Sequence, residues 1–154
     1  MRLSARVDYA LRAAAELAVS PDGPVTAEQL ARAQDIPGKF LENILTQLRR
    51  AGLVRSQRGP VGGYWLARDP AEISLADIIR AVDGPLANVR GERPEEVDYE
   101  GAARSLQQVW IALRASERSI LEGVTLHHLA TNTLPSVVRS LAEDPESWVN
   151  HAHR

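Results

Sequence analysis

The chain has 154 residues, of which 44% are hydrophobic and 25% charged, a balance typical of a soluble globular protein. It contains no cysteine, which excludes disulfides, thiol catalysis and thiolate-ligated zinc or iron–sulfur sites. No apolar run approaches the roughly 18 residues that a membrane span requires, and the first residues lack the apolar core of a signal peptide. We therefore expect a cytoplasmic protein with no membrane partner.

The net charge of −2 is unevenly distributed along the chain. Residues 36–68 hold six basic side chains and one acidic, a local charge of +5, whereas residues 85–154 hold seven basic and ten acidic, a charge of −3. The basic stretch is a candidate contact surface for a polyanion such as nucleic acid. Charge alone leaves a second interpretation equally open, in which these arginines only solvate helix faces.

Apolar residues at helical spacing predict a first helix over 4–18, with Ser4 as its N-cap. A second helix is expected from Thr26, which begins a capping box, to about Gln34. After a short turn, Pro37 stands at the first position of a third helix that ends at Gly52. The apolar face of this third helix is predicted to hold Phe40, Leu41, Ile44, Leu45 and Leu48.

The pattern changes after Gly52 from helical spacing to short strands. Residues 53–58 and 64–67 predict two strands, and the glycine-rich residues 59–63 predict the hairpin tip between them. Ser74 then caps a fourth helix over 75–82. The order helix, helix, tight turn, helix, strand, hairpin, strand is that of a winged helix-turn-helix domain. We place this domain at residues 1–84.

The second half of the chain is predicted to have a different organisation. Residues 85–99 are charged and poor in apolar side chains, which predicts a loop, with disorder as an alternative. A long helix is expected from about 100 to 123, and a short helix capped by Thr125 completes a unit at 100–130. Residues 131–154 are expected to form a loosely packed tail. The predicted fold is thus mainly α, with a small two-stranded antiparallel wing and a long C-terminal helix.

The long helix is expected to join two copies of the chain. A helix of about two dozen residues is about 35 Å long, which exceeds the flank of a small domain. Packing entirely within one chain is the alternative. The apolar stripe predicted to form the dimer contact consists of Leu106, Val109, Trp110, Leu113, Ile120 and Val124.

The third helix and the hairpin carry the groups expected to contact DNA. In a helix-turn-helix the second of two steeply crossed helices enters a major groove about 12 Å wide, and glycines let a hairpin backbone approach the sugar–phosphate chain. We expect Asn43 and Gln47 to read bases, and Arg50 and Arg55 to contact phosphates. The complete set is Thr26, Lys39, Phe40, Glu42, Asn43, Thr46, Gln47, Arg50, Arg55, Arg58, Gly59, Gly62 and Gly63.

Three blocks of the sequence resemble the Rrf-two family of bacterial regulators, the IscR/NsrR/CymR-like proteins. They are residues 3–13, with Asp-Tyr-Ala-Leu-Arg-Ala; residues 36–54, from Ile-Pro-Gly-Lys-Phe to Gly-Leu-Val; and the wing with the following helix, 58–84. The resemblance covers about residues 2–130. It implies a homodimer joined through the helix near 102–124 and operator recognition by the helix at 37–51, with the wing beside it.

One difference from that family concerns the cofactor. Many members hold an iron–sulfur cluster with three cysteines in the loop before the dimer helix, and residues 86–99 contain none. Where some members add a histidine ligand this chain has Gln107. Where others add an acidic residue it has Asp8, which we interpret as a solvated or helix-terminal carboxylate. The chain resembles the cluster-free branch, in which CymR-type regulators sense through a partner protein. No cofactor is expected, and the signal is expected to enter through a partner protein, a small ligand or the histidines.

The sequence offers no enzyme motif. His127 and His128 diverge by about 100° on a helix, which suits neither a metal nor a catalytic dyad, and HExxH and GxSxG are absent. We predict no catalytic residues and no metal site, although a metal held by His151 and His153 is an alternative to a solvated tail. The expected function is a sequence-specific DNA-binding repressor acting as a homodimer on a palindromic operator. The alternative is a protein-interaction module built on a winged-helix scaffold.

Overall fold

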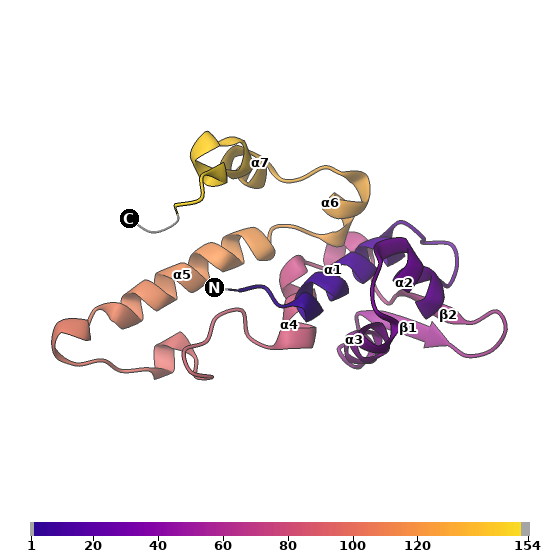
Figure 1. Ribbon diagram of the computed structural model, residues 1–154, viewed down its shortest axis with the longest axis horizontal. Coiled ribbons are helices and arrows are strands. Elements are labelled where there is room, and N and C mark those ends of the chain that lie inside the picture. Colours follow the sequence, from indigo (N-terminus) through magenta and orange to yellow (C-terminus); the bar gives the residue numbers. More distant parts are fainter. Residues whose placement is uncertain (1, 152–154) are drawn as a thin grey trace.

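The computed structural model describes residues 2–151, with a helical head at one end and a long helix leading away from it (Figure 1). This arrangement confirms the predicted fold class, mainly helical with a two-stranded antiparallel wing. The head contains α1 (Ala5–Ala18), α2 (Ala27–Gln34), α3 (Gly38–Arg50), β1 (Val54–Gln57), β2 (Gly63–Leu66) and α4 (Leu75–Asp83). The remaining helices are α5 (Leu106–Leu121), α6 (Leu126–Thr131) and α7 (Ser136–Glu143).

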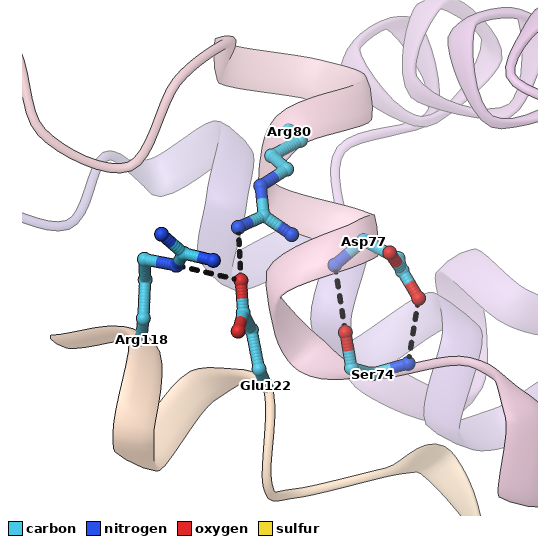
Figure 2. Close-up of polar contacts among 5 residues, drawn as sticks. All are labelled: Ser74, Asp77, Arg80, Arg118 and Glu122. Atoms are coloured by element: carbon cyan, nitrogen blue, oxygen red, sulfur yellow. Dashed lines mark hydrogen bonds and ion pairs between the residues drawn. The ribbon is translucent and has the colours of Figure 1, made fainter. Parts of the chain in front are cut away.

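Side-chain caps fix where three helices of the head, α1, α2 and α4, begin. The Ser4 side chain accepts a hydrogen bond at the start of α1, and Thr26 forms a capping box with Gln29 at the start of α2. Ser74 and Asp77 form a second capping box at the start of α4, which Figure 2 shows. Each cap satisfies backbone N–H groups that have no partner within the helix. All three caps predicted for the head are confirmed.

The core of the head is built around α1. Alanine occupies four of its six buried positions, so neighbouring helices approach it closely, and α2, α3, α4 and α6 all pack against it. From α3, the side chains of Leu41, Ile44, Leu45 and Leu48 are completely buried. Phe40 was predicted on this apolar face but is 53% exposed, with its ring 6.1 Å from that of Tyr9. It lies in the first turn of α3, at the edge of the head and outside the core.

The wing is a hairpin whose backbone is closely packed at its tip. β1 pairs with β2 from Val54 opposite Leu66 to Gln57 opposite Gly63, and Tyr64 exchanges two backbone hydrogen bonds of 2.8 Å with Val25. A Cβ atom on Gly62 would lie 2.2 Å from the carbonyl oxygen of Gln57. Glycine at this position is therefore required by the fold of the wing itself.

We expect Gly62→Ala to destabilise the protein by roughly 1–3 kcal/mol, because the two strands must separate to accommodate the added methyl group. Urea unfolding measures this as a lower midpoint with an unchanged slope. Gly23→Ala is the matched control, since a Cβ atom there meets nothing within 4 Å. Equal midpoints for the two variants would contradict the explanation.

The segment between α4 and α5 is folded against α5, and the predicted alternative of disorder does not describe it. Pro94 and Val97 are buried, and a 3-10 turn covers Pro94–Glu96. The Gln107 side-chain amide donates to the carbonyl oxygen of Val97 at 2.8 Å and to that of Glu95 at 3.3 Å. A second 3-10 turn, Gly101–Ala103, precedes α5. The long helix consequently begins at Leu106, six residues later than predicted.

The C-terminal segment contains a helix that the sequence analysis does not predict. α7 is followed by a 3-10 turn, Pro145–Trp148, and the Trp148 indole donates to the carbonyl oxygen of Ala142 at 2.5 Å.

Residue 1 and residues 152–154 lie outside the described residues. The alternative prediction of a metal held by His151 and His153 therefore falls outside them as well. Over residues 2–151, no helix has the length and apolar character needed to cross a membrane.

Candidate nucleic-acid interface

A tight turn between α2 and α3 sets the position of α3 within the head. Asp35 ends α2 in the left-handed conformation with φ of 51°, and Ile36 is buried with its N–H bonded to the carbonyl oxygen of Ala31 at 2.9 Å. With the apolar face of α3 turned into the core, its polar side chains lie on the outside. Exposed there are Lys39, Phe40, Glu42, Asn43 and Arg50, and Thr46 and Gln47 are half-buried.

Arg6 of α1 binds the two amide side chains that were predicted to read bases. Its Nη2 donates to Oδ1 of Asn43 at 2.5 Å, and its Nε donates to Oε1 of Gln47 at 3.1 Å. These bonds orient both amides on the outer face of α3. Sequence reasoning missed Arg6, because 37 and 41 residues separate it from its partners and no local pattern indicates the contact.

The six basic side chains of residues 36–68 are all exposed, and none forms an ion pair within residues 2–151. Arg49 donates to Oγ of Ser56 at 3.3 Å, which links the end of α3 to β1. The Arg55 guanidinium lies 5.0 Å from the centre of the Trp65 ring on the opposite strand, a cation–π contact. These positive charges therefore remain available to an external anion.

Two of the predicted DNA-binding hydroxyls already serve the fold. Oγ1 of Thr46 donates to the carbonyl oxygen of Glu42 at 2.9 Å, one turn earlier in α3. Oγ1 of Thr26 accepts from the Gln29 N–H at 3.1 Å as the N-cap of α2. Both can still accept a hydrogen bond, but only Thr46 lies on the outer side of α3.

Glycine is needed at the three positions of the wing for different structural reasons. Gly59 has φ of 110°, a conformation that other residues rarely adopt, and a Cβ atom on it would meet nothing within 4 Å. Gly62 and Gly63 are both required by close backbone approach, from Gln57 and from Val25. Their presence is explained within the chain, and contact between the wing tip and DNA stays a prediction. Arg58, at the edge of the tip, is exposed.

The predicted apolar stripe of α5 divides into exposed and covered parts. Val109 is 53% exposed and Leu113 is 42% exposed, whereas Leu106, Trp110 and Ile120 are half-buried. Val124 is only 3% exposed, and its carbonyl oxygen accepts from the Leu75 N–H at 2.9 Å. Its assignment to the dimer contact was wrong, because it belongs to the junction of α5 with the head. The exposed Ile111 adds an apolar side chain that was not predicted.

The residues at the positions of the family's iron–sulfur ligands do not fit such a cluster. The chain has no thiolate to offer, and the Gln107 amide is bonded to loop carbonyls. Asp8 accepts from Arg12 at 2.7 Å in an ion pair along α1. Over residues 2–151 there is no group of three or more histidine, aspartate or glutamate side chains that could hold a metal ion.

The sequence model of the Rrf2 family, described as an iron-dependent transcriptional regulator, matches residues 3–132. Rv1287 of Mycobacterium tuberculosis, named as a candidate HTH-type transcriptional regulator, is 50% identical over 99% of this chain and 96% of its own length. The HTH-type transcriptional regulator CymR of Bacillus subtilis is 37% identical over 86% of this chain and 92% of its own.

Among solved structures, that of CymR from B. subtilis, titled the global cysteine regulator, is similar with a TM-score of 0.74 and 33% identity. The match covers 86% of this chain and 98% of that chain. Together with the head and wing described above, these matches identify a regulator and not an enzyme. The chain belongs to the Rrf2 family of DNA-binding helix-turn-helix transcriptional regulators, and it is a member that lacks cysteine.

Proposed function

We propose that the protein is a homodimeric repressor that recognises a palindromic operator without an iron–sulfur cluster. The observation that carries the proposal is the set of six exposed basic side chains on α3, the wing and their flanks, none in an ion pair within residues 2–151. Such a surface suits a phosphate backbone, whose neutralisation supplies much of the free energy of DNA binding.

In the proposed complex α3 lies in the major groove. Amide side chains read adenine by donating to N7 and accepting from N6, so Asn43 and Gln47 suit that role. Arg6 occupies both amide oxygens in the unbound protein. Each amide oxygen can accept a second hydrogen bond, so Asn43 and Gln47 can accept from a base while Arg6 still holds them in place, and the Arg6 guanidinium then lies close to the DNA. Arg50 and Arg55 contact phosphates, and Arg58 reaches the backbone or the narrow minor groove.

Two copies of the chain are needed to explain recognition of a palindrome. The exposed apolar side chains Val109 and Leu113 provide a self-complementary contact on α5, the helix that leads away from the head (Figure 1). Paired through them, two heads address half-sites about one helical turn of DNA apart. A dimer bound over a promoter excludes RNA polymerase, which is the physical basis of repression.

We expect Asn43→Ala to relax sequence preference at one base pair in each half-site, at a cost of about 1–3 kcal/mol per lost contact. An operator is first selected from a pool of random duplexes with the wild-type protein. Fluorescence anisotropy then compares the selected and scrambled duplexes for Asn43→Ala and for Gln108→Ala, a control on the exposed side of α5.

An unchanged ratio of selected to scrambled binding in Asn43→Ala would remove this base-reading assignment. Failure of the wild-type protein to enrich any sequence would instead favour the alternative of a protein-interaction module. The variant Arg6→Ala tests the same assignment in a second way. Because Arg6 orients both amides, its loss should also lower the ratio, through Asn43 and Gln47 together.

A further inference from the structure

An arginine-rich cleft of about 530 Å³ lies where α4, the segment that follows it and α5 meet. Four of its nine lining residues are arginines, and they come from all three of these parts of the chain. Neither the predicted DNA-binding residues nor the predicted apolar stripe of α5 contributes to the lining that the structure describes. The arginines of this arginine cleft are Arg80 of α4, Arg93 of the connecting segment, and Arg114 and Arg118 of α5.

The positive charges of the arginine cleft exceed the negative charges around it. Among the described lining residues the single acid is Glu95, and Glu122 lies between Arg80 and Arg118. The pKa of Glu95 is lowered by a backbone hydrogen bond and by one from Arg114, and the pKa of Glu122 by hydrogen bonds from Arg80 and Arg118. Both carboxyl groups are therefore ionised at neutral pH. Four positive charges against these two negative charges leave a net charge of +2.

The internal ion pairs leave most of the guanidinium donors unused. Figure 2 shows that Arg80 and Arg118 both donate to one atom, Oε1 of Glu122, at 2.5 Å and 3.0 Å. Each of them uses one of its three guanidinium nitrogens for this bond. Arg114 uses one nitrogen to bind Glu95, and the exposed Arg93 forms no ion pair within residues 2–151. The other N–H groups are available to a bound molecule.

We propose that the arginine cleft binds a small organic molecule with two negative charges, a dicarboxylate or a phosphate monoester. A guanidinium group is a planar fork that binds carboxylate or phosphate oxygens through two parallel hydrogen bonds. Two negative charges also balance the net charge of the cleft. A cluster that served only to join α4 to α5 would gain nothing from the two additional arginines, because like charges repel one another.

The proposed dimer contact leaves the arginine cleft accessible. Arg118 follows Val109 by nine residues, which at about 100° per residue places the two side chains on opposite sides of α5. Arg114 follows Val109 by five residues and is turned from it by about 140°. A second copy of the chain that covers Val109 therefore approaches a different side of α5 from the one that lines the cleft.

The position of the arginine cleft gives its ligand a route to the DNA-binding head. Glu122 already joins the end of α5 to Arg80 of α4. A dianion held between Arg80, Arg93 and Arg114 adds a second link among the head, the connecting segment and α5. It thereby restricts the angle of α5 to the head, and in a dimer joined through α5 this angle sets the spacing of the two heads on DNA. This consequence, unlike the binding itself, rests on the proposed function.

Calorimetric titration of the full chain, in a buffer free of phosphate, sulfate and citrate, tests the site without DNA. The dianionic probes are succinate, glutarate and glycerol 3-phosphate. Their analogues are succinamate and glutaramate, which carry one charge, and glycerol, which carries none. We expect a dianion to bind about tenfold or more tightly than its analogue, as a hydrogen bond to a charged group provides. Added salt should weaken the binding, and the ratio of affinities for the dicarboxylates and the phosphate identifies the preferred oxyanion.

Two variants should change dianion binding in opposite directions. Arg93→Gln should weaken it about tenfold, because it removes a guanidinium group without breaking an ion pair within residues 2–151. Glu95→Gln should strengthen it, because it removes the carboxylate that competes for Arg114. A damaged fold would weaken binding in both, so the opposite signs separate recognition from folding. Arg139→Gln, at an exposed arginine of α7, is the matched control and should change nothing.

The NMR signals of the arginine Nε–H groups provide an independent readout, since those of Arg93, Arg114 and Arg118 should shift as a dianion is added. Failure of every dianion to bind, equal binding by wild type and Arg93→Gln, or an equal loss in Arg139→Gln would overturn the proposal. So would binding of polyglutamate without binding of any small dianion, because the arginines would then belong to a contact with an acidic protein. DNA binding does not enter these measurements, so their failure leaves the proposed function standing.

Discussion

The double charge reversal Arg50→Glu and Arg55→Glu should lower DNA affinity by about a hundredfold or more at physiological salt. Both side chains are exposed and form no ion pair within residues 2–151, so the two substitutions break no ion pair of the folded protein. Each lost phosphate contact also reduces the slope of log affinity against log salt by about 0.9. Anisotropy titrations at several salt concentrations measure both quantities. The loss should be similar for operator and scrambled DNA, because phosphates carry no sequence information.

The matched control for this experiment is Arg104→Glu with Arg139→Glu. It changes the net charge by the same amount, at two exposed arginines of the second half of the chain that lie outside the interface proposed here. If the effect arose from overall charge, both double variants would bind DNA equally weakly. That outcome, or an unchanged salt slope in Arg50→Glu with Arg55→Glu, would place the DNA contact elsewhere. The cation–π contact of Arg55 with Trp65 contributes only about 0.5–1 kcal/mol at an exposed site, so the fold should persist.

Local signals explain why the head could be predicted from the sequence. Capping residues at Ser4, Thr26 and Ser74 marked the helix starts, and the change from helical to strand spacing after Gly52 marked the wing. Each of these signals lies within a few residues of the feature it determines. Phe40 shows the limit of this reasoning, because an apolar residue at the edge of a helical stripe is buried only if another element covers it.

The features that could not be predicted depend on contacts between distant segments. Arg6 meets Asn43 and Gln47 only after α1 and α3 have packed together. Val124 continues the apolar spacing of α5, yet its backbone bond to Leu75 draws it into the junction with the head. The charged segment before α5 is ordered through two carbonyl oxygens that accept from Gln107, a contact that hydrophobic periodicity cannot reveal.

The proposed dimer contact leads to the second large expected effect. Val109→Asp with Leu113→Asp places two carboxylates on the exposed apolar side of α5, and burying them at an interface would carry a large desolvation cost. We expect a monomer in sedimentation velocity at concentrations where wild type is a dimer. Ala115→Asp with Gln108→Asp is the control, since both residues are exposed on the opposite side of the helix and their replacement costs at least as much helix propensity.

Operator binding should fall with the dimer, by about a hundredfold to ten-thousandfold. A dimer that holds one half-site presents its second head at a high effective concentration to the other half-site, and a monomer loses this advantage. The α3 face is unchanged in the variant, so binding to a single isolated half-site should match that of one wild-type head. This combination separates loss of pairing from loss of DNA recognition. A variant that remains dimeric, or a monomer that binds the full operator as tightly as wild type, would show that α5 does not join the two heads.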